Sequence, residues 1–132
     1  MTSDDLALAL HLVDVAAAVT LPAFGRRLDV KLKADATVVT EVDAAAERAV
    51  RAALREHRPD DGVLGEEEGL DPGTSGRVWV VDPIDGTRMY AEGIPLWTTL
   101  VALRDASGTL VGVADAPASA LRLQAARGAG AW

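Results

Sequence analysis

The sequence contains no cysteine, few aromatic residues and no excess of positive charge. Without cysteine there can be no disulfide and no thiolate ligand, so any metal must be bound by oxygen or histidine nitrogen. Only 4% of the 132 residues are aromatic, so we expect a core built mainly from Leu and Val. A formal net charge of −7 argues against nucleic acid and anionic membranes as partners, because both are themselves negatively charged.

The sequence also lacks a recognisable export signal. Its first five residues include two aspartates and no basic residue, whereas a secretory signal starts with basic residues, and the apolar stretch that follows is interrupted by His11 and Asp14. We therefore expect no segment apolar enough to cross a membrane. The absence of cysteine fits a reducing compartment, and a cytoplasmic location is expected.

Two segments have the apolar spacing of amphipathic helices. The first starts near Leu6, and its predicted buried face is Leu6, Leu10, Val13, Ala17, Leu21 and Phe24. The second starts at Thr40, whose hydroxyl can cap it, and ends before Pro59. Its predicted buried face is Val42, Ala45, Ala46, Ala49, Val50, Ala53 and Leu54.

Short β-rich runs follow the helices. Residues 77–81 predict a strand that stops at the Asp82-Pro83 step, because proline cannot donate to a β-ladder. Residues 97–103 and 110–116 predict an antiparallel pair, and 121–125 a further strand. Helices first and strands after predict an α+β fold: one domain over residues 1–132, with two helices packed on an antiparallel sheet.

The segment Asp82-Pro83-Ile84-Asp85-Gly86-Thr87 carries the clearest chemical signal. Pro83 and the β-branched Ile84 stiffen the chain, so that the Asp82 and Asp85 carboxylates and the Ile84 carbonyl can converge on one point. Hard divalent cations prefer such oxygen ligands. The segment therefore predicts a metal site at the end of a strand.

Gly86 and Thr87 extend this site toward an anion. Gly86 lets the backbone approach a ligand closely, and Thr87 offers an amide and a hydroxyl at a possible helix start. Asp-Pro and Asp-Gly on their own are ordinary turn formers. The whole hexapeptide after a hydrophobic strand, with Gly65-Glu66-Glu67 upstream, is far more specific, and it indicates that metal and phosphate meet there.

These motifs resemble the inositol monophosphatase family, which carries Gly-Glu-Glu, a strand and then Asp-Pro-Ile-Asp-Gly-Thr. The resemblance covers essentially the whole chain, including residues 40–43 and 126–131. Residues 93–103 look most like the histidinol-phosphate phosphatase branch. The resemblance implies the N-terminal domain of a sugar-phosphatase fold, with the family's C-terminal substrate domain absent.

The resemblance also implies roles for individual residues. Glu66, Asp82, Asp85 and the Ile84 carbonyl resemble ligands of Mg2+, and Glu66 also helps to orient the attacking water. Gly86 and Thr87 resemble the pair that binds phosphate. Thr87 would also act with Asp43 to position or deprotonate the water. Lys33 resembles a basic residue near a third metal position.

Each of these roles has a structural alternative. Asp43 lies three residues after Thr40, the spacing of a capping box, so it also suits a helix start. Glu67 and Glu68 have the composition of a solvated acidic loop and receive no ligand role. Lys33 is equally consistent with a solvated lysine.

The implied activity is Mg2+-dependent hydrolysis of a phosphate monoester by a metal-activated water. Histidinol phosphate, a substrate of histidine biosynthesis, and inositol monophosphate are the expected substrates. The alternative is a truncated, catalytically weak or inactive remnant that binds metal or dimerises. Besides the small-molecule substrate, the expected partner is a second copy or a separate C-terminal half.

Overall fold

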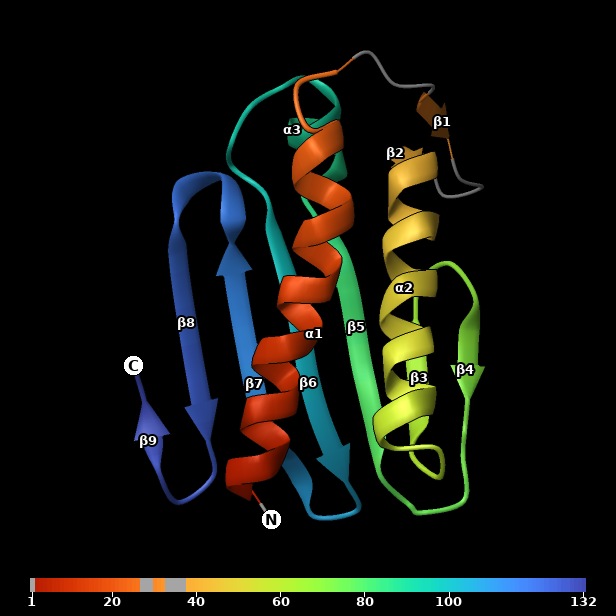
Figure 1. Ribbon diagram of the computed structural model, residues 1–132, viewed down its shortest axis with the longest axis vertical. Helices are drawn as coiled ribbons and strands as arrows, with labels where there is room; N and C mark the ends of the chain where they lie inside the picture. Colours follow the sequence, from red (N-terminus) through yellow and green to blue (C-terminus); the bar gives the residue numbers. More distant parts are fainter. Residues whose placement is uncertain (1, 27–29, 33–37) are drawn as a thin grey trace.

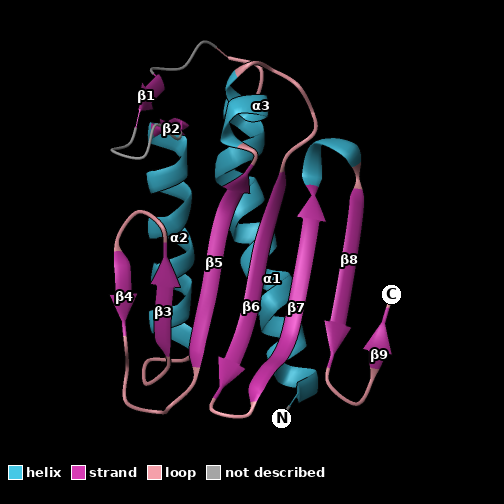
Figure 2. Cartoon of the chain, turned by 180° about the vertical axis from the view of Figure 1, so that it is seen from behind, coloured by secondary structure: helices cyan, strands magenta, loops and turns pink. Residues whose placement is uncertain are grey.

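The computed structural model describes residues 2–26, 30–32 and 38–132. Two long helices lie side by side on one face of a seven-stranded sheet, as Figure 1 shows. Seen from behind in Figure 2, the described strands leave the opposite face of the sheet without a covering helix. The helical elements are α1 Thr2–Ala23, α2 Glu41–His57, the short α3 Thr87–Ala91 and the 3-10 turn η1 Pro117–Ser119.

The sheet is antiparallel apart from one pair of strands. Its strands, in spatial order, are β4 Gly69–Asp71, β3 Gly62–Gly65, β5 Val78–Asp85, β6 Thr98–Asp105, β7 Gly108–Ala116, β8 Leu121–Ala126 and β9 Gly130–Ala131. A separate ribbon pairs β1 Val30–Leu32 with β2 Val38–Thr40. The predicted α+β fold is confirmed, with the difference that β3 and β5 run parallel.

Strand β5 continues through the acidic motif, and the predicted stop at Asp82-Pro83 is wrong. The register with β6 shifts between Asp82 and Asp85, as in a β-bulge. A bulge tolerates Pro83, because its missing N–H is not needed in the ladder. The Thr99 hydroxyl donates to the Pro83 carbonyl oxygen at 2.8 Å and fixes the irregular segment.

Helix α1 buries a different face from the predicted one. Its buried apolar residues are Leu8, Ala9, Leu12, Val13 and Ala16. Of the predicted face only Val13 is among them, and Leu21 is 41% exposed. Apolar residues surround most of this helix, so a three-and-four spacing fits several faces. Packing against β6 and β7 selects the one that is buried.

By length and composition alone, residues 3–23 of α1 would suffice to cross a membrane, contrary to the sequence expectation. This is the one such helix in the described part of the chain. Its buried face belongs to the main hydrophobic core together with Trp79 and Leu103. Core helices and signal sequences near the N-terminus both pass this test, and 33% of the α1 window is buried. Helix α1 therefore packs one face into the core and is not buried on all sides.

Helix α2 presents charged side chains to the interior. It starts at Glu41, directly after β2, and the side chain of Thr40 lies outside the described residues. The predicted Ala45, Ala49 and Ala53 are only half-buried. The buried residues are Val42, Asp43, Ala46, Glu47, Val50, Arg51 and Leu54.

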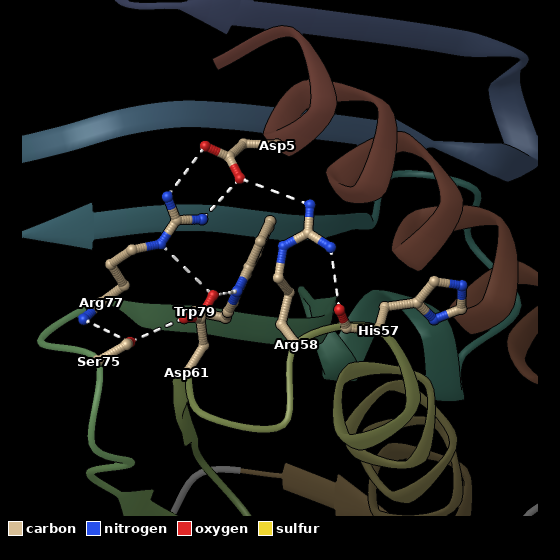
Figure 3. Close-up of polar contacts among 7 residues, drawn as sticks. All are labelled: Asp5, His57, Arg58, Asp61, Ser75, Arg77 and Trp79. Carbon is tan, nitrogen blue, oxygen red and sulfur yellow. Dashed lines mark hydrogen bonds and ion pairs between the residues drawn. The ribbon is translucent and has the colours of Figure 1, made fainter. Parts of the chain in front are cut away.

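An ion-pair cluster fastens the first turn of α1 to the sheet (Figure 3). Asp5, only 2% exposed, accepts two hydrogen bonds from Arg77, at 2.6 and 3.2 Å. Arg58 approaches the same carboxylate to 3.9 Å. The Trp79 indole donates to Asp61 at 2.9 Å, and Arg77 lies 3.5 Å from Asp61. The cluster joins α1, the loop after α2 and the start of β5.

Replacing Arg77 tests the contribution of this cluster. Arg77→Met leaves the buried Asp5 carboxylate without its two-hydrogen-bond partner, so we expect the free energy of unfolding to fall by about 3 kcal/mol. Urea denaturation measures the change. As a control, Asp14→Asn breaks the pair of Arg122 with Asp14, whose side chain is 63% exposed, and is expected to cost under about 1 kcal/mol. Equal unfolding midpoints for Arg77→Met and wild type would contradict the prediction.

Candidate metal and phosphate site

The parallel pairing of β3 with β5 brings the two acidic segments together. Gly65 pairs with Val81, so the residues that follow them, Glu66 and Asp82, are neighbours. Both line a hollow of about 300 Å3, together with Leu64 and Val80. Side chains alternate along β5, and Trp79 and Val81 point into the core under the helices. Asp82 therefore points to the helix-free face.

Asp82 lies among like charges. Burial raises the pKa of its carboxyl from 3.8 to about 6, and the charges of Glu66, Asp85 and Asp43 add to the effect in that order. Four acidic side chains from three segments of the chain thus act on one another. Such a concentration of negative charge is costly without a cation.

Thr87 connects the acidic motif to α2. Its Oγ1 lies 3.1 Å from Oδ1 of Asp43 and 3.1 Å from the Ile84 carbonyl oxygen. Asp43 is 3% exposed and belongs to the first turn of α2. The prediction that the start of the second helix lies beside the motif is confirmed. Because a hydroxyl has one proton, Thr87 shares it between these two acceptors.

The Ile84 side chain anchors the motif from below. It is 2% exposed and belongs to a small cluster with Val42, Tyr90 and Trp97. Its side chain is thus held in the core while its carbonyl faces Thr87. This carbonyl is the group that the sequence predicts as a metal ligand, and its oxygen has a second lone pair beside the one that faces Thr87.

Gly86 takes a backbone conformation that other residues rarely adopt. Its φ of 89° lies in the left-handed region, and a Cβ here would come within 3.2 Å of the Leu96 carbonyl oxygen. Thr87, the next residue, opens α3, so its N–H lies in a first turn that offers no intrahelical acceptor. The binding of phosphate by Gly86 and Thr87 stays a prediction.

Tyr90 is near the site but belongs to the core. Burial raises the pKa of its phenol to about 12, and the charge of Asp43 adds to this. The hydroxyl donates to the Thr20 carbonyl oxygen at 2.7 Å, and the ring packs edge-on against Trp97. A phenol held neutral in this way packs and donates, and it is unsuited to exchange protons at neutral pH.

Within residues 2–26, 30–32 and 38–132, no three Asp, Glu, His or Cys side chains are gathered closely enough to form a complete metal site. Glu66 and Asp85 are exposed, and like charges separate unless a cation lies between them. The available donors are all oxygens, the kind that Mg2+ binds. The negative charges of Glu66, Asp85 and Asp43 all act on the Asp82 carboxyl. The donor chemistry fits, and the ligand roles of these residues and of the Ile84 carbonyl stay predictions.

One predicted residue and one overlooked residue complete the site description. Lys33 lies outside the described residues. Glu47 was missed, although it is 0% exposed and bonds to the turn that carries Glu66. The available signal was the four-residue spacing of Asp43, Glu47 and Arg51, which places three charges on the otherwise apolar face of the helix.

The charge on Asp82 predicts a gain in stability when it is removed. Its pKa is higher in the folded chain than the ordinary 3.8, so the folded state holds the proton more tightly, and stability falls as the pH rises from about 4 to about 6. Asp82→Asn should therefore unfold at higher urea than wild type at pH 7.5 in a chelator. The gain should shrink toward pH 4.

The control for this prediction is Asp105→Asn. Hydrogen bonds from Ser107 lower the pKa of this exposed carboxyl, which is the opposite direction, so no gain is expected at pH 7.5. Unfolding of Asp82→Asn at lower urea than wild type at pH 7.5 would show that the carboxylates do not repel one another as described.

A sequence model of the inositol monophosphatase family matches residues 2–132. The chain is 48% identical to a histidinol-phosphatase of Mycobacterium tuberculosis, with 100% of this chain and 51% of the relative covered. It is 46% identical to a histidinol-phosphatase of Streptomyces coelicolor, covering 98% of this chain and 50% of the relative. An inositol-1-monophosphatase of Rhizobium meliloti is 42% identical over 81% of this chain and 41% of the relative.

Solved structures agree with these matches. An IMPase from Thermotoga maritima superposes with a TM-score of 0.91 at 31% identity, covering 98% of this chain and 50% of its own. The extragenic suppressor protein suhB from Bartonella henselae superposes with a TM-score of 0.92 at 30% identity, over 98% and 51%. The chain spans about half the length of the curated relatives it matches.

Proposed function

Because the chain belongs to the inositol monophosphatase family, we propose that it forms the metal-binding half of a Mg2+-dependent phosphate-monoester hydrolase. The family resemblance seen in the sequence is confirmed. Histidinol-phosphatases at 45–48% identity support histidinol phosphate as the substrate. The inositol-1-monophosphatase at 42% identity supports inositol monophosphate as the second candidate.

One observation carries the proposal: Thr87 contacts the buried Asp43 beside the strand end where Glu66 and Asp82 meet. This places a hydroxyl and carboxylate pair next to a group of acidic oxygens. Glu66, Asp82, Asp85 and the Ile84 carbonyl would hold Mg2+. When bound, Mg2+ lowers the pKa of a coordinated water and offsets the negative charge of a phosphate ester.

Thr87 and Asp43 would remove the proton of the attacking water. The Thr87 hydroxyl donates to Asp43 at 3.1 Å, so it can accept a proton from a water on its open side while Asp43 takes the hydroxyl proton. Asp43 is 3% exposed, which limits its hydration and keeps its charge directed at Thr87. The overall acidity of the chain does not exclude an anionic substrate, because the cation reverses the local charge.

The helix-free face of the sheet favours a second structural unit that packs against it. It carries an apolar hollow of about 750 Å3, lined by residues that include Leu100, Leu123 and Trp132. Leu123 and Trp132 are each 56% exposed. An apolar face of a sheet is normally covered by another element of the fold. Since the relatives are about twice as long, we propose that a segment equivalent to their other half packs here. Asp82 also lines this hollow, so that segment would form a wall of the site.

The proposal is tested by release of inorganic phosphate from histidinol phosphate and inositol monophosphate. We expect Mg2+-dependent turnover when the chain is mixed with a separately produced C-terminal half of the Mycobacterium tuberculosis relative, and weak or no turnover from the chain alone. Asp85→Asn removes one proposed ligand and should lower turnover about 100-fold. The exposed Asp105→Asn, in the hairpin between β6 and β7, should leave it unchanged.

Three outcomes would contradict the proposal. Turnover that persists in a chelator, or that survives Asp85→Asn, would remove the metal site from the reaction. Mg2+ binding by calorimetry without turnover in any mixture would favour the alternative, a metal-binding or dimerising remnant.

A further inference from the structure

We propose that Glu47 is a positioning residue, which fixes the turn that carries Glu66 and thereby sets the affinity of the site for Mg2+. The inference rests on the proposed function, because it concerns the same metal site. Glu47 lies one helical turn after Asp43 on the buried face of α2. It therefore contacts the turn that carries Glu66 from the buried side of that turn.

The Glu47 carboxylate is bonded directly to the backbone of the turn. Its Oε1 accepts the Glu67 N–H at 3.0 Å, and its Oε2 accepts the Glu68 N–H at 2.8 Å. These two amides immediately follow Glu66, whose own side chain is exposed. Two hydrogen bonds to one carboxylate fix both peptide planes and so limit where the Glu66 side chain can start.

Arg51 completes the arrangement from the next turn of α2. Its Nε lies 3.2 Å from Oε2 of Glu47 and balances that buried charge. Its Nη2 donates to the Gly69 carbonyl oxygen at 2.5 Å, at the first residue of β4. The backbone from residue 67 to residue 69 is thus held by two side chains of one helix.

Packing alone does not require a charge at this position. Ala46 and Val50 fill the same buried face with apolar side chains, and replacing a buried ion pair with apolar residues is often neutral or stabilising. A carboxylate that is 0% exposed is costly to bury unless its hydrogen bonds are all made. Here they are directed at the turn, so the charge specifies the geometry of that turn.

Gly65 has the same explanation. It lies in β3 without a positive φ, so a special backbone conformation does not require glycine there. A Cβ at this position would come within 2.3 Å of Oε1 and 2.4 Å of Cδ of Glu47. Glycine is needed because the Glu47 carboxylate passes directly against the strand.

Conservative changes at these positions should weaken metal binding without removing a ligand. Glu47→Gln keeps the shape but offers one acceptor oxygen to two amides. It leaves Arg51 with only the half-exposed Glu68 carboxylate, 3.4 Å away, as a charged partner. Gly65→Ala retains Glu47 and Arg51 but displaces the carboxylate from the turn. Mutation of groups that orient metal ligands typically lowers metal affinity 10–100-fold. We expect about a tenfold loss of Mg2+ affinity in each variant.

The test is calorimetric titration of Mg2+ into the full chain, with urea denaturation of every variant alongside. Arg77→Met serves as the matched control, because it disrupts a buried ion pair at the start of β5, away from the site at the end of that strand. It should lose stability and keep its Mg2+ affinity. Asp85→Asn serves as the ligand control and should lose binding. NMR exchange rates of the Glu67 and Glu68 amides should rise in Glu47→Gln and Gly65→Ala.

The outcomes separate this inference from the function on which it rests. A tenfold loss in Glu47→Gln and Gly65→Ala, with Arg77→Met unchanged, supports the positioning role. Wild-type affinity in a folded Glu47→Gln or Gly65→Ala variant, with binding lost in Asp85→Asn, overturns it and leaves the proposed function standing. A wild-type chain that binds no Mg2+, or an Asp85→Asn variant that binds it as tightly, overturns the proposed function and this role together. Should Glu47→Gln fail to fold, Gly65→Ala decides, since it changes no charge.

Discussion

Like charges held together at the end of β5 are the constraint on which the site depends. The parallel register of β3 and β5 places Glu66 beside Asp82, and the first turn of α2 adds Asp43. Burial and the neighbouring carboxylates raise the pKa of Asp82 to about 6. The surrounding bonds keep these groups from separating fully: Thr99 holds the bulge, Thr87 holds Asp43, and residues behind the Glu66 turn hold its backbone.

Carboxylates at the two ends of β5 have opposite consequences for stability. In the cluster of Figure 3, the buried Asp5 is paired with Arg77 and approached by Arg58, so its charge adds stability. At the site, Asp82 is surrounded mainly by other acids. A charge pattern that lowers stability is commonly retained where function requires it. In the proposed function, the end of β5 with Asp82 would serve binding, whereas the start of β5 with Arg77 serves stability.

The family and the α+β fold could be predicted from the sequence, because each depends on local spacing or on a short run of residues such as the acidic motif. Prediction failed where tertiary packing decides. Helix α1 is apolar on most sides, so its spacing did not reveal that Leu8 and Leu12 would be buried while Leu21 stayed exposed. Pro83 predicted a strand end, whereas pairing with β6 accommodates it in a bulge. The buried Glu47 breaks the rule that charged residues lie outside, so apolar periodicity could not find it.

The position of Asp82 separates metal binding from substrate choice in the proposed function. Asp82 lines the small acidic hollow with Glu66 and also the large apolar hollow with Leu100 and Leu123. A segment that covers the apolar hollow would therefore reach the edge of the metal site without supplying the ligands proposed from this chain. The carboxylates come from residues 43–85 and the groups that support them from residues 47–99. The surface beside them is left for another segment to shape. In the proposed function, substrate selection would depend on the segment that packs against this half. The matches to histidinol-phosphatases and to an inositol-1-monophosphatase are consistent with relatives of different substrates that share this half.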